Sequence, residues 1–244
     1  LEAAGVSSIV MDISFDTYRK NDVKGDSRFA ETLFFYPNVT IGTTLINSKK
    51  EFEELDPDYR EKLAESKDYL RFRYKFANPD KYYFPDFFSM YKLVPPEEMF
   101  MQAANSYCTY EIGLPSSDGI YHSIPLVINE KYMNSEKEGS NLLLPNIDIL
   151  GLVSHFGLKP GDYVFDIKNK EIRLGDRLTI PVDSSGYFNI NYYGKSSFDE
   201  IAAVDILNNS ADSLQRIFKD KIVLIGYTAR AKGIFDARPT PFNN

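Results

Sequence analysis

The chain contains three short runs rich in β-branched and aliphatic residues, at residues 6–13, 39–45 and 222–225. The last run has four apolar residues in succession and ends at Gly226. A continuous apolar run is typical of a strand covered on both faces, whereas alternation is typical of a strand with one face in water. Residues 222–225 are therefore predicted to form a central strand of a mainly parallel sheet, with Gly226 allowing a sharp turn at its carboxyl end.

The segment between the first two runs predicts a helix that begins near Asp26 and ends before Pro37. Strand, helix, strand is the pattern of a βαβ unit, whose two strands run parallel in one sheet. Residues 51–67 are charged and amphipathic, which predicts a surface helix interrupted at Pro57. The predicted fold class is α/β, with a mixed, mainly parallel central sheet flanked by helices.

The second half of the chain adds shorter apolar runs separated by turn residues. Residues 107–112 and 120–128 flank an Asp-Gly turn, which predicts a β-hairpin. A capping box at residues 197–200 predicts a helix that reaches Leu207. Four further short strands are predicted at residues 163–167, 171–174, 178–182 and 187–193. Together with the hairpin, they form a predicted antiparallel, β-rich insertion.

Residues 69–92 alternate aromatic side chains with arginine and lysine, and a second cluster of aromatic residues follows. Such a segment could stack on nucleic-acid bases. It could instead form a strand with aromatic and cationic faces, followed by an aromatic loop packed on the domain. A contact surface for a partner subunit is a third interpretation. The overall charge favours the second, because nucleic-acid affinity depends on positive charge.

The 244 residues carry a formal net charge of −7 and are 43% hydrophobic, a composition that indicates a folded protein. The acidic balance argues against wide contact with nucleic acid or anionic membranes. No apolar run approaches the roughly 20 residues that cross a bilayer. Cys108 is the only cysteine, which excludes an intrachain disulfide and a multi-cysteine metal site. We expect no cofactor.

Signatures of nucleophile elbows, phosphate-binding loops and dinucleotide sites are absent from the sequence. The two histidines, His122 and His155, lie far apart in the sequence, and neither has a second histidine four residues away. The carboxylates of Asp12, Asp16 and Asp236 are the strongest candidates for chemistry. They could hold a divalent cation, as in a soluble magnesium-dependent α/β hydrolase or phosphatase. Alternatively, they cap turns and helix starts near the edge of the sheet.

Three blocks of sequence, taken in order, carry a family resemblance. Residues 6–15 read V-S-S-I-V-M-D-I-S-F after a helix end at A-A-G, and residues 180–194 read I-P-V-D-S-S-G-Y-F-N-I-N-Y-Y-G before a helix carrying V-D-I-L. Residues 218–229 read F-K-D-K-I-V-L-I-G-Y-T-A and precede D-A-R-P-T-P at residues 236–241. The chain thereby resembles the second family of CHASE domains, the cyclase/histidine-kinase-associated sensing extracellular domains.

The resemblance covers nearly the whole chain and leaves residues 69–92 as an aromatic and basic insertion. It implies one sensor domain over residues 1–244, lacking the family's first strand and helix and its last segment. Met11 and Tyr227 differ from the family's usual aromatic and alanine at those positions. No catalytic residue is attributed to the family, so the resemblance implies no enzymatic activity for the domain itself.

The resemblance also implies a setting. The domain would lie on the extracytoplasmic side of a bacterial membrane, anchored by flanking helices and paired as a homodimer. It would bind an unknown small ligand or partner protein and regulate a cytoplasmic output such as a nucleotide cyclase or kinase. Because ligands meet open α/β sheets at the carboxyl ends of the strands, the predicted ligand site is a crevice formed by Gly226, Tyr227, Thr228 and Arg230, with Asp12 and Asp236 opposite.

Overall fold

The computed structural model describes residues 1–16, 22–77, 87–132, 142–159, 162–194, 197–227 and 240. Four parallel strands form the central sheet in the order β15 (Ile222–Ile225), β1 (Ser8–Ser14), β2 (Val39–Thr43) and β7 (Ser106–Thr109). Helix α1 (Val23–Phe35) connects the neighbouring strands β1 and β2, so the predicted βαβ unit is confirmed. The α/β fold class is confirmed with it.

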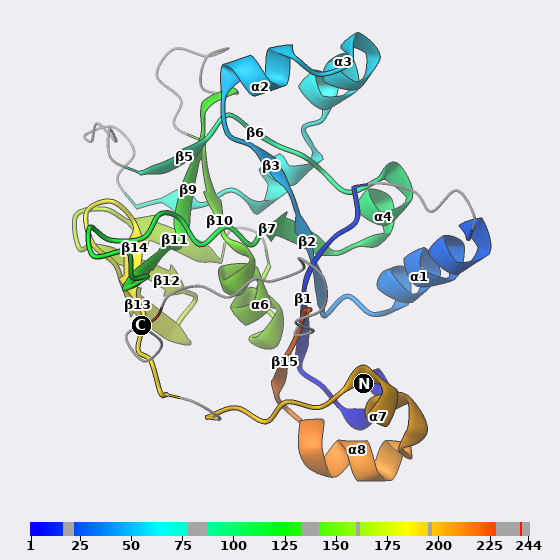
Figure 1. Cartoon of the computed structure of the whole chain (residues 1–244). Helices are drawn as coiled ribbons and strands as arrows, with labels where there is room; N and C mark the ends of the chain where they lie inside the picture. Colours follow the sequence, from blue (N-terminus) through cyan, green and yellow to red (C-terminus); the bar gives the residue numbers. More distant parts are fainter. Residues whose placement is uncertain are drawn as a thin grey trace.

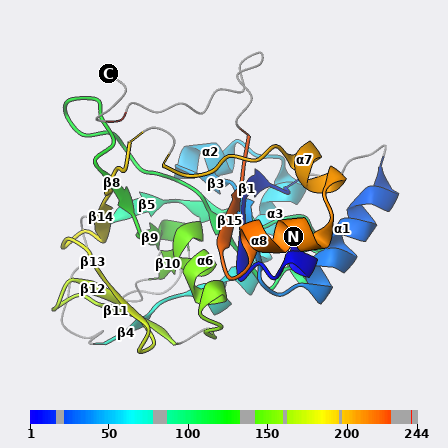
Figure 2. The same ribbon diagram turned by 90° about the horizontal axis from the view of Figure 1, so that it is seen from below.

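Helices cover both faces of the sheet (Figure 1). Helix α6 (Ile147–His155) packs against β1, β2 and β7 on one face. Helices α1 and α4 (Glu98–Ala103) contact each other on the opposite side, and the view from below in Figure 2 keeps α6 and α1 apart across the strands. This layering buries β2 completely, because every one of its five residues lies between the two helical layers.

The predicted central position of residues 222–225 is wrong. Among the described residues, β15 pairs only with β1 and therefore forms an edge of the central sheet. Val223 and Ile225 pack against the core, whereas Leu224 between them is 73% exposed. The strand has one packed face and one wet face despite its continuous apolar sequence, so its composition did not decide its place in the sheet.

The predicted hairpin across residues 107–128 is also wrong. Its first half forms strand β7, the last strand in the order of the central sheet, and its second half divides into two short strands that pair elsewhere. Strand β8 (Ser123–Pro125) pairs with β14 (Tyr187–Asn189). A separate sheet has the order β10 (Leu143–Pro145), β9 (Val127–Glu130) and β5 (Phe88–Met90).

The predicted antiparallel strands in the second half are confirmed as a meander. Strands β11 (Tyr163–Asp166), β12 (Glu171–Leu174) and β13 (Leu178–Pro181) pair in sequence order. A two-residue strand from much earlier in the chain, β4 (Lys75–Phe76), adds to β11 in parallel. The meander is therefore joined to the rest of the molecule by residues that the sequence places about ninety positions away, as the pairing of Val164 with Lys75 shows.

The helix boundaries follow their capping residues. Asp22, and not the predicted Asp26, caps α1 by accepting a hydrogen bond from Gly25 N at 2.9 Å. The predicted interruption at Pro57 is confirmed by two helices, α2 (Lys49–Glu53) and α3 (Pro57–Glu65). The capping box at residues 197–200 is wrong, because α7 (Ala203–Asn208) begins later and has no side-chain cap. The other elements are α8 (Ala211–Phe218), β3 (Leu45–Ile46), β6 (Lys92–Leu93) and the 3-10 helices η1 (Glu2–Ala4) and η2 (Asp68–Phe72).

The aromatic segment that begins at Tyr69 supplies core side chains. Its first part forms η2 and not the predicted strand, and Tyr69, Phe72 and Tyr74 are all buried in the main core. The ring of Phe72 meets Tyr107 edge-on at 5.2 Å, and Tyr74 donates a hydrogen bond to the carbonyl of Leu126 at 2.9 Å. Rings fixed in this way cannot stack on bases, so the structural interpretation is confirmed for residues 69–74. Residues 78–86 lie outside the described part of the chain.

Candidate functional site

The structure brings together two of the predicted crevice residues. Asp12 and Gly226 lie at the carboxyl ends of the neighbouring strands β1 and β15, and a Cβ atom on Gly226 would lie 3.7 Å from Asp12 Cβ. Asp12 is exposed, and the Tyr227 side chain is 66% exposed. Gly226 does not use the left-handed backbone region that favours glycine. The other predicted members, Thr228, Arg230 and Asp236, lie outside the described residues.

Asp16 points to a different place. It follows β1, and its Oδ2 accepts a hydrogen bond from Thr44 Oγ1 at 3.1 Å, at the end of β2. Within the described ranges, no three or more His, Cys, Asp or Glu residues lie close enough to hold a metal ion. The histidines take partners elsewhere, since His122 binds Asp118 at 2.9 Å and His155 binds Ser7 Oγ at 2.7 Å.

Cys108 has no nucleophilic character in this fold. It is buried in β7, and its thiol donates a hydrogen bond to the carbonyl of Pro145 at 2.8 Å. Burial raises the pKa of the thiol to about 12, so it is protonated at neutral pH. A thiolate is the reactive form of cysteine, and none is available here. The cysteine is a small core residue.

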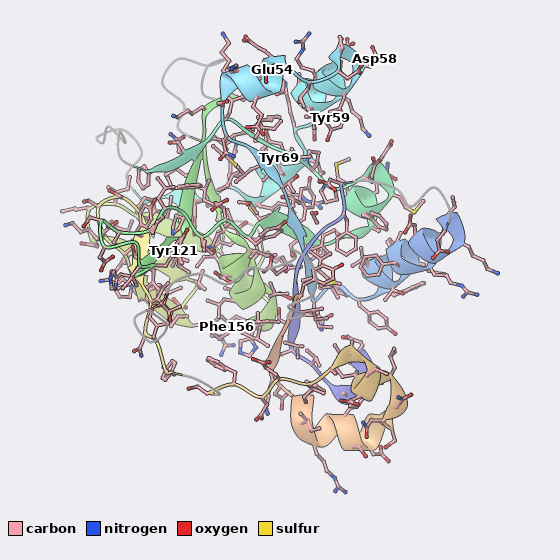
Figure 3. The ribbon with its side chains drawn as sticks, viewed as in Figure 1. Glu54, Asp58, Tyr59, Tyr69, Tyr121 and Phe156 are labelled. Carbon is pink, nitrogen blue, oxygen red and sulfur yellow. The ribbon has the colours of Figure 1, made fainter. Side chains whose placement is uncertain are left out.

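The carboxyl edge of the central sheet carries a cavity of about 320 Å³. Such a volume is typical of small-molecule sites. Four segments build its wall: the end of β1, helix α3, the turn into η2 and the start of α4. The lining residues are Asp16, Tyr59, Lys62, Leu63, Glu65, Ser66, Lys67, Asp68, Pro95, Pro96, Glu97, Glu98 and Met101. Figure 3 shows Tyr59 on α3, with Tyr69 deeper in the molecule.

Aromatic packing and backbone hydrogen bonds fix the position of Asp16. The preceding residue, Phe15, stacks on Phe29 of α1 at 4.9 Å and meets Phe100 of α4 at 5.5 Å. The carbonyl of Phe15 also accepts a hydrogen bond from Glu97 N at 2.8 Å. The start of α4 is thereby tied to the end of β1, and both of these walls of the cavity are held by the core.

Acidic side chains outnumber basic ones among the described residues that line the cavity. Lys62 Nζ lies 3.6 Å from Glu97 Oε2, which is the one ion pair within the described lining. The half-buried Tyr59 has a raised pKa because burial disfavours its phenolate, and the charges of Asp16 and Glu97 add to the effect. A neutral hydroxyl and two neighbouring carboxylates therefore face this space.

A buried charge network lies behind one wall. Lys92 and Glu130 are fully buried, with Lys92 Nζ 3.6 Å from Glu130 Oε1. Tyr69 donates to Glu130 Oε1 at 2.7 Å and accepts from Lys92 Nζ at 2.6 Å. The lysine also donates to the carbonyl of Ser66 at 3.2 Å, which connects the network to the cavity lining. Burial raises the pKa of Glu130, and Lys92 opposes that effect.

Sequence reasoning missed both the cavity and this network. Lys92 ends the aromatic segment and Glu130 ends an apolar run, so each resembled a surface charge at the end of a strand. A lysine between Tyr91 and Leu93 was the available signal, because single charges within apolar strands are often paired inside the fold. The cavity could not be found, because its walls come from segments that the sequence keeps apart.

The fold and the site together define an α/β domain with a ligand-sized cavity at the carboxyl edge of its sheet. Within the described part of the chain, no cluster of three His, Cys, Asp or Glu residues could hold a metal ion, and the single thiol is buried and hydrogen-bonded. A comparison with family models matches residues 1–244 to the CHASE2 domain, so the chain belongs to the CHASE2 family. CHASE2 is a sensory extracellular domain of cyclase and kinase signalling proteins, and this protein is therefore a sensory domain. Searches of curated proteins and of solved structures gave no match.

Proposed function

We propose that this domain is the extracytoplasmic sensor of a membrane-anchored bacterial signalling protein and that it regulates a cytoplasmic nucleotide cyclase. The observation that carries the proposal is the match of the CHASE2 family to all of residues 1–244. Within the described residues, no helix is both long enough and apolar enough to cross a membrane. We also propose that helices in flanking sequence anchor the domain.

A sensor of this kind needs two states whose balance a ligand can change. A ligand shifts that balance only by the difference between its affinities for the two states. The cavity suits this task, because its walls come from the end of β1, from α3 and from α4. A ligand that contacts all three elements would favour whichever state holds them in this arrangement. We propose that the output domains act as a homodimer that responds to this change.

The crevice at Asp12 and Gly226 stays a second candidate locus. Two of its described members, Asp12 and Gly226, lie together at the carboxyl edge, which supports a place for ligand or partner contact there. Arg230 would pair with an anionic group, and Asp236 would lie opposite. Replacing Arg230 or Asp236 with alanine should then change signalling while the domain still folds. Unfolding of both variants would show that the two residues are structural.

Labelling in whole cells tests the location. The native thiol is buried, so a cysteine introduced at the exposed Glu61 is the reactive one in the variant Glu61→Cys. In the full-length protein, we expect a membrane-impermeant maleimide to label this variant in intact cells as well as in lysed ones. Labelling that requires lysis would contradict an extracytoplasmic domain.

Nucleotide cyclase assays on membranes that contain the full-length protein test the output. We expect deletion of residues 1–244 to change the cyclase rate and its response to added ligand. Protein levels in the membranes, measured by immunoblot, control for loss of expression. A full-length protein without cyclase activity, or with a rate independent of this domain, would contradict the proposed output. The family assignment does not depend on that result.

A further inference from the structure

We infer that the cavity beside Asp16 and Tyr59 binds an organic cation, namely an ammonium group carried on a small apolar body. The inference names the ligand class of the proposed sensor and so rests on the proposed function. Three features of the described lining support it: more carboxylates than cations, the ring of Tyr59 and a set of apolar side chains.

Carboxylates outnumber cations among the lining residues that the structure describes. Asp16, Glu65, Asp68, Glu97 and Glu98 supply five acids, against Lys62 and Lys67. Lys62 forms an ion pair with Glu97. Asp68 Oδ2 lies 3.4 Å from a guanidinium nitrogen of Arg71, which is not among the described lining residues. Among the described residues, Asp16 has no Lys or Arg nitrogen within ion-pair distance, and its Oδ2 accepts a hydrogen bond from the Thr44 hydroxyl. Its charge in this partly covered position attracts a cation more strongly than it would in open water.

Tyr59 adds a second feature that favours a cation. Its ring lines the cavity beside Asp16 and Glu97, and the face of a tyrosine ring attracts a cation that lies over it. The pKa of its hydroxyl is raised, so the side chain is neutral and adds no charge of its own to the cavity. An anionic ligand would meet the same two carboxylates and would be repelled. The two carboxylates therefore favour a cationic ligand over an anionic one.

The remaining walls suit an apolar body. Leu63, Pro95, Pro96 and Met101 face the space between the carboxylates. Proline rings have fixed backbone angles, so this part of the wall is preorganised, and a methionine side chain adapts to ligand shape. A bare metal ion would gain nothing from such a surface. The combination of apolar walls and separated carboxylates fits an amphipathic amine.

Titration calorimetry with three probes of equal shape tests the inference on the 244-residue chain. The probes are 2-phenylethylammonium, the neutral 2-phenylethanol and the anionic phenylacetate. We expect the ammonium compound to bind at least about tenfold more tightly than the alcohol, and phenylacetate to show no binding. Equal affinity for ammonium and alcohol, or no binding of the ammonium probe, would overturn the inference.

Matched variants locate the binding. Asp16→Asn removes the charge but keeps an acceptor for Thr44, and we expect about tenfold weaker ammonium binding. Glu61→Gln is the control, because Glu61 lies on the same helix α3 but does not line the cavity. Tyr59→Leu should weaken binding about fourfold and Tyr59→Phe should not, because only the leucine variant loses the ring. An affinity unchanged in Asp16→Asn and Tyr59→Leu would also overturn the inference.

The cyclase assay distinguishes a wrong ligand class from a wrong output domain. If the ammonium probe binds but does not change the rate of the full-length protein, the ligand class stands and the proposed output fails. If the domain regulates the cyclase but the ammonium probe does not bind, the proposed function stands and the ligand class fails.

Discussion

Strands β2 and β15 belong to the same parallel sheet, yet their environments are opposite. All five residues of β2 are buried, although its sequence V-T-I-G-T contains two threonines and a glycine. Strand β15 reads I-V-L-I and is the more apolar of the two, yet Leu224 is 73% exposed. The difference comes from position, because α6 and the α1–α4 pair enclose β2 from both sides, whereas β15 has a strand neighbour on one side among the described residues.

The comparison shows what an apolar run establishes. An apolar run predicts a strand, because β-branched residues are enriched in strands, and both runs do form strands. It does not predict how many layers cover that strand, since coverage depends on helices that are remote in the sequence. The covered interior and the exposed edge should therefore respond very differently to equivalent substitutions.

The largest effect should come from the buried charges in the covered interior. Lys92→Met leaves Glu130 buried without its cation, and we expect a loss of about 3–5 kcal/mol in the free energy of unfolding. The control is Lys49→Met, which breaks the exposed pair with Glu53 and should cost about 0–1 kcal/mol. Denaturant unfolding measures both. Similar losses in the two variants would contradict a buried pair.

This loss should depend on pH. Burial raises the pKa of Glu130, so the folded protein binds that proton more tightly than the unfolded chain does. The contribution of the bound proton is present below the carboxyl's ordinary pKa and is lost as pH rises through the raised value. Without Lys92 the neutral form is favoured further. Unfolding of Lys92→Met should therefore show a smaller deficit at acidic pH than at neutral pH, and the opposite trend would contradict the assignment.

Equivalent truncations on the two strands should differ next. Ile41→Ala on β2 removes a fully buried side chain, and we expect a loss of about 2–5 kcal/mol. Leu224→Ala on β15 removes an exposed one and should stay within about 0.5 kcal/mol of the parent chain. Thermal and denaturant unfolding of both variants would measure the difference. A large loss in Leu224→Ala would mean that this face of β15 is covered in solution.

Two glycines provide a smaller version of the same contrast. A Cβ atom on Gly151 of α6 would lie 2.5 Å from Val10 Cγ2, so Gly151→Ala forces the helix off the sheet and should cost about 1–3 kcal/mol. A Cβ atom on Gly226 would lie at ordinary contact distance from Asp12, and Gly226→Ala should change stability by less than about 0.5 kcal/mol. Parallel unfolding curves test the pair, and a larger effect at Gly226 would reverse the interpretation.

The smallest effect should appear at Cys108. Burial raises the pKa of its thiol to about 12, so folding holds a proton that the unfolded chain releases at lower pH. The thiol's contribution to stability is present below its ordinary pKa and falls as pH rises toward 12. At pH 8, we expect a thiol reagent to label the native chain far more slowly than the denaturant-unfolded chain. Equal labelling rates would show that the site opens readily.

Helices and strands could be predicted from the sequence better than the pairing of the strands. The βαβ unit, the antiparallel meander and the break at Pro57 could be found, because turn residues and periodicity are local signals. The edge position of β15 and the failure of the predicted hairpin at Asp118-Gly119 could not, because strand pairing is decided by remote segments. The family could be predicted from the sequence, because three blocks in the expected order are more specific than any one of them.

The candidate site divides in the same way. The rule that ligands meet α/β sheets at the carboxyl edge points to the edge where the cavity lies, and Asp16 lies there beside Thr44. The cavity lining could not be predicted, because Tyr59, Ser66 and Pro95 come from turns and helix ends whose meeting depends on the packing around Phe15. The crevice at Arg230 and Asp236 remains a prediction.

The central claim is that the domain meets its ligand at the cavity under α3 and α4, and two methionines can test it in one experiment. Met101 lines that cavity, whereas Met11 lies opposite Ile225 in the β1–β15 pair beside the predicted crevice. Titration of 2-phenylethylammonium into the chain labelled with ¹³C at its methionine methyl groups should shift the Met101 signal saturably and leave the Met11 signal in place. A saturable shift at Met11 with an unmoved Met101 would contradict the account.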